Sequence, residues 1–190
     1  RGRDIKRYYY EWAGLWVIIA KFGFYKESHL YPSIVQHLTK YEEQLKNRGQ
    51  CKYNRQNKVN INKDYTGQHH WLELDNNPNE NYLNEFEKEK VVWAETDQSF
   101  NTVIVPSCMY LQKTCFMIIT KIPKIINAFL NSSIIQWYIR KRSSNLGEKG
   151  MSLTKQTVET IPIPPITSSN QHIVSQIESL VDKILAAKKT

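Results

Sequence analysis

The hydrophobic residues of this chain fall into short runs that are separated by polar turns. One run, at residues 14–20, is continuously apolar, and its length and β-branched residues predict a buried strand. Further strand-like runs occupy residues 71–74, 90–95, 102–105, 108–111 and 116–120. Together these runs predict a twisted mixed sheet that is largely antiparallel.

Apolar residues at helical spacing predict a helix at residues 32–48. Pro32 suits the first turn of this helix, where a missing N–H costs nothing, and Gly49 stands where a C-terminal cap is expected. Residues 123–130 predict a second helix of the same amphipathic kind.

A third helix is expected to begin at Ser132 or Ser133, whose hydroxyl groups can cap it, and to end in a basic turn. Its apolar side chains are expected to pack inward: Ile134, Ile135, Trp137, Tyr138 and Ile139. A stiff, proline-rich connector at residues 161–165 leads to the clearest amphipathic helix of the chain. The apolar stripe of this last helix consists of Ile173, Ile177, Leu180, Val181, Ile184 and Leu185.

These elements predict an α+β fold in which helices pack on the sheet. We divide the chain into a domain at residues 1–165 and a C-terminal amphipathic helix at residues 166–190, which packs on the domain or on a parent protein. The first residue is Arg1 rather than Met, so we expect the chain to be part of a longer protein.

The formal net charge of +8 favours a polyanionic partner. The positive charge is concentrated in residues 44–63, which hold six basic residues and no acidic one. Two other interpretations of this segment stay open: its charges form a solvated face, or its Asn, Gln and Lys content reflects AT-rich coding of a loop.

Recognition of DNA requires Lys and Arg against phosphates, and Arg, Lys, Asn or Gln against base edges. Three segments supply these residue types: the first residues, residues 47–68, and the basic end of the third helix with the turn after it. We expect Arg48, Lys52, Arg55 and Lys58 to face DNA, with the opening residues and residues 140–142 on phosphates. The candidate DNA-binding residues are Arg3, Lys6, Arg7, Arg48, Lys52, Asn54, Arg55, Lys58, Arg140, Lys141, Arg142 and Lys149.

Motifs for catalysis are missing: the sequence has no glycine-rich phosphate loop, no dinucleotide fingerprint and no Gly-x-Ser-x-Gly elbow. Adjacent histidines at 69 and 70 point to opposite faces of a strand, and with Cys51 or His37 they make only a loose zinc constellation. Glu87 and Lys90 have the spacing of a metal-dependent nuclease, but a solvated charge run explains them better. We therefore expect no catalytic centre and no metal site.

Three cysteines without regular spacing indicate a reducing compartment. We find no signal peptide, and the apolar run at 14–20 is far shorter than the ~20 residues that span a bilayer. A cytoplasmic protein without a membrane partner is expected.

Several short motifs occur in a characteristic order. Gly2-Arg3-Asp4-Ile5 is followed by Tyr31-Pro32, and later by Trp71-Leu72-Glu73-Leu74 and by Phe86 with Lys90-Val91-Val92 four residues on. Leu130-Asn131-Ser132 and Pro162-Ile163-Pro164 complete the set. In this order they resemble the TaqI-like C-terminal specificity, or target-recognition, domain of type II (IIG) restriction-modification enzymes and adenine-specific DNA methyltransferases.

The resemblance implies sequence-specific recognition of double-stranded DNA by a domain that has no catalytic centre of its own. It implies a parent with an upstream N6-adenine methyltransferase domain, often with an endonuclease domain, and S-adenosylmethionine and Mg²⁺ bound there rather than in this chain. Two alternatives from other classes stay open: a non-catalytic protein-interaction module that acts through its C-terminal helix, and a small Mg²⁺-dependent nuclease that uses Glu87 and Lys90.

Overall fold

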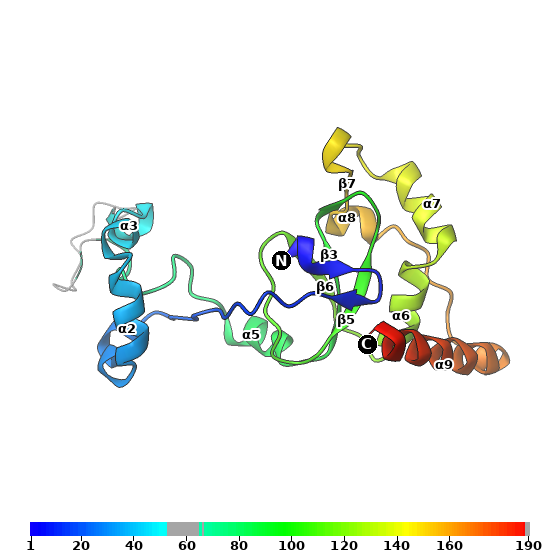
Figure 1. Cartoon of the computed structure of the whole chain (residues 1–190), viewed down its shortest axis with the longest axis horizontal. Coiled ribbons are helices and arrows are strands. Elements are labelled where there is room, and N and C mark those ends of the chain that lie inside the picture. Colours follow the sequence, from blue (N-terminus) through cyan, green and yellow to red (C-terminus); the bar gives the residue numbers. More distant parts are fainter. Residues whose placement is uncertain (53–64, 66, 189–190) are drawn as a thin grey trace. The chain divides into compact units, whose positions relative to one another are not determined.

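The computed structural model describes residues 1–52, 65 and 67–188. The chain forms two compact units (Figure 1). Unit 1 combines Arg1–Leu15 with Leu83–Thr190, and unit 2 is the inserted segment Trp16–Tyr82. Among the described helices, none combines the length and the apolar composition that a membrane crossing requires.

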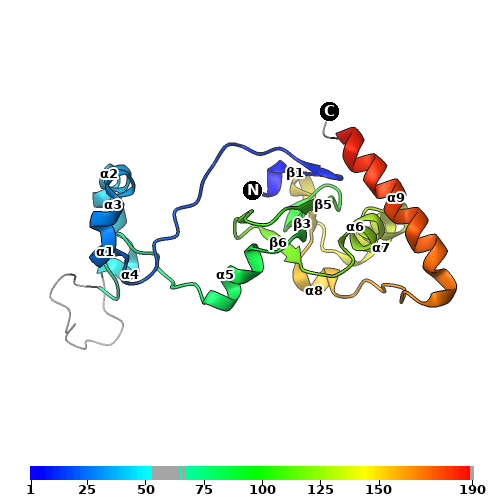
Figure 2. The same cartoon turned by 90° about the horizontal axis from the view of Figure 1, so that it is seen from below.

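The centre of unit 1 is a three-stranded antiparallel sheet in the order β5-β3-β6 (Figure 2). Strand β3 (Lys90–Ala94) is buried along its whole length between β5 (Thr102–Val105) and β6 (Cys115–Ile118). Two antiparallel pairs flank this sheet. They are β1 (Ile5–Lys6) with β2 (Tyr9–Tyr10), and β4 (Thr96–Asp97) with β7 (Met151–Ser152).

Alternation along β3 explains how its two faces are covered, since successive side chains of a strand point to opposite sides. Val91 and Trp93 belong to the larger core with residues of the helices, whereas Val92 packs with Ile5 and Val103 in a second cluster. The helices of unit 1 are α5 (Glu80–Phe86, which begins in unit 2), α6 (Pro123–Leu130), α7 (Ser133–Arg142), α8 (Lys155–Val158) and α9 (Gln171–Lys188).

The Leu-Asn-Ser motif joins the helices to the sheet. The side chain of Asn131 is fully buried, and its amide accepts a hydrogen bond from Thr102 N (3.1 Å) and donates one to Thr102 O (2.9 Å). Ser132 caps α7, because its hydroxyl accepts from Ile135 N at 3.4 Å. The motif therefore fixes the junction of α6 and α7 against the first residue of β5.

Unit 2 consists of short helices: α1 (Phe24–Glu27), α2 (Pro32–Thr39), α3 (Glu42–Lys46) and α4 (Gly49–Lys52). Its buried residues include polar ones. His69 and Glu73 are almost fully buried beside Cys51 and Leu72. The interior of this unit is therefore held by hydrogen bonds as much as by apolar packing.

The predicted α+β class is confirmed, and every described strand pair is antiparallel. The strands predicted near residues 90–95, 102–105 and 116–120 are present, as is the helix at 123–130. Helix α9, which we expected to pack on the domain or on a parent protein, packs on α6 within unit 1, where Lys124 and Asp182 form an ion pair of 2.7 Å.

Three predicted strands are wrong. Residues 14–20 carry no strand, and Trp16 in this segment, which leads from unit 1 into unit 2, is 86% exposed. Residues 71–74 form a turn, because Glu73 N donates to His70 O (2.9 Å) and the buried Glu73 carboxylate accepts from Gly23 N (2.6 Å). At residues 108–111 the positive φ of Cys108, 62°, interrupts the extended backbone.

The helix predicted at 32–48 is divided into α2 and α3, and Gly49 begins α4 instead of capping it. The Thr39 hydroxyl donates to Val35 O at 2.8 Å, a back-bond that bends helices, and Tyr41 leaves the helical region with φ −117°. In α7 the inward packing holds for Ile135 and Ile139 but is wrong for two other residues. Ile134 is 66% and Trp137 is 62% exposed.

Candidate nucleic-acid interface

An open cavity of about 840 Å³ lies in unit 1 where five segments meet. Its walls come from the first residues up to β1, from Leu15, from residues 94–101 around β4, from the turn at residues 112–114, and from the turn that holds Lys149. The cavity therefore joins parts of the chain that are up to 148 positions apart in the sequence, from Arg1 to Lys149.

Three of the predicted DNA-binding residues line this cavity: Arg3, Lys6 and Lys149. Arg3 and Lys149 are exposed and Lys6 is half-buried. No described acidic side chain forms an ion pair with any of the three, so their charges are available to an anion. The structure thus brings together two of the three basic segments that the sequence indicated.

Two glycines explain why these segments can approach each other. Gly2 passes the end of the central strand β3 so closely that a Cβ atom there would lie 3.2 Å from the Cβ of Ala94. Gly150 has a φ of +92°, and its Cβ would lie 2.3 Å from Asp97 O. A side chain at Gly150 would therefore push the Lys149 turn away from the cavity wall, which makes glycine a requirement for the position of Lys149.

Amide and acidic side chains line the same cavity: Gln98, Asn101, Gln112, Glu95 and Asp97. The Asp97 carboxylate already has partners within the chain, since it accepts hydrogen bonds from Gln98 N (2.7 Å) and from the Asn101 amide (3.1 Å). Reasoning from the sequence missed all of these residues as part of a site. They are scattered over several turns, and no local pattern of residue types marks them.

The other predicted DNA-binding residues of unit 1 do not line this cavity. Arg7 is exposed and its guanidinium donates to Asn131 O at 2.9 Å. Arg140 and Lys141 are exposed at the end of α7, and the Arg142 guanidinium lies 4.9 Å from the centroid of the Tyr138 ring. Arg142 lines a smaller cavity of about 280 Å³ with Gln156, Thr157 and Thr160.

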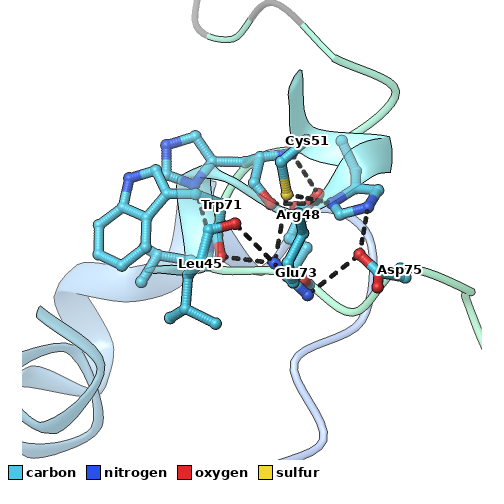
Figure 3. A network of polar contacts seen from close by, with 9 residues as sticks. Leu45, Arg48, Cys51, Trp71, Glu73 and Asp75 are labelled. Carbon is cyan, nitrogen blue, oxygen red and sulfur yellow. Dashed lines mark hydrogen bonds and ion pairs between the residues drawn. The ribbon is translucent and has the colours of Figure 1, made fainter. Parts of the chain in front are cut away.

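In unit 2, Arg48 is the centre of a polar network (Figure 3). Its guanidinium donates to three main-chain carbonyls, those of Leu45 (3.1 Å), Trp71 (2.8 Å) and Glu73 (2.7 Å). It also forms an ion pair of 3.2 Å with Asp75. Almost all the hydrogen-bonding capacity of this arginine is therefore used inside unit 2. Lys52 is exposed, whereas Asn54, Arg55 and Lys58 lie outside the described residues.

The Cys51, His69 and Asp75 side chains offer ligand atoms that all lie within 4.8 Å of one another. The prediction that the histidines lie in a strand was wrong, and it hid this proximity. Arg48, however, contacts Cys51 Sγ at 3.3 Å as well as Asp75, so a fixed positive charge already lies between the possible ligands. Burial also raises the pKa of the Cys51 thiol, which disfavours the thiolate that a metal needs. The group is better explained as internal support than as a metal site.

The nuclease alternative requires an accessible Lys90, and the structure does not provide one. Lys90 is fully buried, and its ammonium donates to the carbonyls of Phe86 (2.8 Å), Lys88 (2.7 Å) and Pro106 (3.3 Å). Burial lowers its pKa. An ammonium in this position cannot contact a phosphate, and the Phe-x-x-x-Lys motif has a structural role in closing the turn before β3.

Unit 1 has the features of a recognition domain, namely an α+β scaffold with cations that are unpaired among the described residues and with amide side chains around an open cavity. The family model of the TaqI-like C-terminal specificity domain matches residues 1–163, and the chain belongs to this family. Domains of this type are non-catalytic and serve target recognition in restriction-modification enzymes. No curated protein matches the chain. The matched region ends before α9.

Proposed function

We propose that this chain recognises a specific sequence of double-stranded DNA for a restriction-modification enzyme. The observation that carries the proposal is the cavity of unit 1, where Arg3, Lys6 and Lys149 are gathered without an acidic partner beside side chains that can bond base edges. We take Arg7 and the basic end of α7 as further phosphate contacts. Arg48 is not among the proposed DNA contacts, because its N–H groups donate hydrogen bonds that hold unit 2 together.

The parent enzyme in this proposal is of type IIG, with an N6-adenine methyltransferase domain, and an endonuclease domain in many such enzymes, elsewhere in the protein. S-adenosylmethionine and Mg²⁺ belong to those domains, and the place of action is the cytoplasm. The family match supports the linked methyltransferase, since specificity domains of this type work with one.

The test is selection from a randomised duplex pool at low salt, followed by sequencing. The wild-type chain is expected to enrich a short motif. A triple variant with Arg3→Glu, Lys6→Glu and Lys149→Glu is expected to retain almost no DNA. Three exposed lysines that do not line the cavity provide a control with a comparable change of charge: Lys26→Glu, Lys40→Glu and Lys183→Glu.

The dependence of affinity on salt gives an independent measure. If five to eight phosphates are contacted, log K falls with log salt with a slope of roughly −5 to −7, and each cation that is removed from the interface reduces the slope by about 1. Retention of DNA without enrichment of a motif would contradict sequence-specific recognition. Equal binding by the cavity variant and the control would contradict the cavity as its location.

A second candidate, docking through the C-terminal helix, is favoured by one observation. Ile173 and Leu180, two turns apart on α9, are 48% and 57% exposed. We propose that this stripe packs on the methyltransferase domain of the parent. Leu180→Lys is expected to weaken that association and to leave the DNA preference of the chain unchanged; loss of the DNA preference would contradict this assignment.

A further inference from the structure

The cavity of unit 1 contains a mixture of charges that phosphate binding alone does not explain. Glu95 and Asp97 line it together with Arg3, Lys6 and Lys149. Carboxylates repel phosphates, whereas the edges of bases present N–H groups that donate hydrogen bonds to carboxylate and amide oxygens. A site of this composition suits the edge of a base pair, with the neighbouring phosphates on the cations.

Of the three amide side chains in the cavity, two already have partners within the chain. The Gln98 amide donates to Glu148 O at 2.5 Å, and the Asn101 amide donates to Asp97 at 3.1 Å. The amide of Gln112 is exposed and forms no hydrogen bond with any described residue. Both its donor and its acceptor are therefore available to a ligand.

The main chain around Gln112 is fixed, although its side chain is free. Gln112 O accepts from Cys115 N at 3.0 Å, which closes the turn that leads into β6, and Thr114 O accepts from Glu95 N at 2.8 Å. The turn is thereby attached to the central sheet at two points. The main chain at Gln112 is therefore fixed, and only the side-chain torsions have to be ordered when the amide binds a base.

We propose that Gln112 reads an adenine of the target sequence, and that the cavity of unit 1 is where the edge of this base pair is recognised. A glutamine amide can bond adenine N6 and N7 at the same time, and no other base presents this pair of groups in the major groove. The inference rests on the proposed function and adds to it a base-reading residue and the base that it reads.

The experiment compares the wild-type chain with Gln112→Ala in the selection from the randomised pool. The variant is expected to lose the preference for adenine at one position of the motif, by roughly 10- to 100-fold, because one bidentate contact is removed. The other positions and the salt dependence should be unchanged. Gln176→Ala, which removes an exposed glutamine amide from α9, is the matched control and should keep the whole motif.

Gln112→Glu gives a second readout that does not depend on loss of binding. A carboxylate accepts from cytosine N4 but cannot donate to adenine N7, so the preference at the same position is expected to move from adenine to cytosine. Both substitutions are at an exposed side chain, and thermal unfolding should confirm an unchanged fold.

The outcomes separate the two proposals. If the wild-type chain enriches a motif and Gln112→Ala enriches the same one with full preference, Gln112 is not a base reader, while DNA recognition stands. If the variant loses affinity for all sequences alike and its salt dependence becomes weaker, Gln112 acts on the backbone, and the inference is overturned. If the wild-type chain enriches no motif, both proposals fail together.

Discussion

Replacing Asn131 by alanine is the most direct test of how the Leu-Asn-Ser motif stabilises unit 1. The Asn131 amide is the acceptor for Thr102 N and a donor to Thr102 O and to Asn127 O, the last at 2.9 Å. Alanine removes all of these contacts at once. Thr102 O keeps a second donor in Tyr8 N (3.1 Å), but Thr102 N loses its acceptor at a buried position.

The magnitude follows from this inventory. An unsatisfied buried N–H costs about 1–3 kcal/mol, and each further lost hydrogen bond costs about 0.5–1.5 kcal/mol. We expect Asn131→Ala to lower the free energy of unfolding by roughly 2–5 kcal/mol, a large part of the ~5–15 kcal/mol that is typical of a domain.

Urea unfolding followed by circular dichroism measures this loss. Asn84→Ala is the control, because Asn84 is exposed on α5 and alanine is the better helix former. Its effect should stay within about 0.5 kcal/mol of wild type. A loss below about 1 kcal/mol for Asn131→Ala would refute the reasoning, since it would mean that Thr102 finds another partner at little cost.

Two further predictions concern the walls of the cavity. Gly150→Ala should lower the free energy of unfolding by roughly 1–3 kcal/mol because of its positive φ, and it should weaken DNA binding because it moves Lys149. Gly49→Ala, which adds a Cβ in open space, should change neither quantity when both variants are measured by denaturation and by DNA binding. The hydrogen bond from Arg1 lowers the pKa of Asp4 to about 2. The stabilisation from this pair is therefore complete above the unfolded pKa of about 3.9 and is lost as the pH falls toward 2, so melting temperatures of wild type and Asp4→Asn should converge over that interval.

The elements that the sequence predicts correctly carry their signals locally. Helix α6 begins at a proline in its first turn, and α7 begins after the capping hydroxyl of Ser132. Strand β5 has β-branched residues in a short run bounded by turns. These signals act through neighbours in the sequence and need no knowledge of the tertiary fold.

The wrong strand predictions fall where residues distant in the sequence determine the local structure. The apolar run at 14–20 has the composition of a buried strand, but it links two units, and no property of the run itself indicates this. The turn at residues 71–74 depends on a carboxylate that accepts a hydrogen bond from Gly23, about 50 residues earlier. An insertion such as unit 2 separates residues that belong together, and local periodicity cannot show where the chain returns.

The candidate site was predictable in part. Arg3, Lys6 and Lys149 were expected to bind DNA, but the density of charge favoured residues 44–63 over the cavity in unit 1. Composition counts charges and does not show which of them are already paired. Arg48 illustrates this, because the sequence cannot distinguish an arginine that binds five groups of its own chain from one that is free.

Arg48 also allows a test that separates support of unit 2 from contact with DNA. Its guanidinium reaches three carbonyls, a thiol and a carboxylate, a geometry that the single ammonium of lysine cannot reproduce. We expect Arg48→Lys to reduce the hydrogen-exchange protection of amides in unit 2 and to leave those of the central sheet in unit 1 unchanged. Lys46→Arg, at an exposed position of α3, is the reverse exchange and should change neither. If Arg48→Lys instead weakened DNA binding with protection intact, Arg48 would contact DNA and its internal contacts would be replaceable.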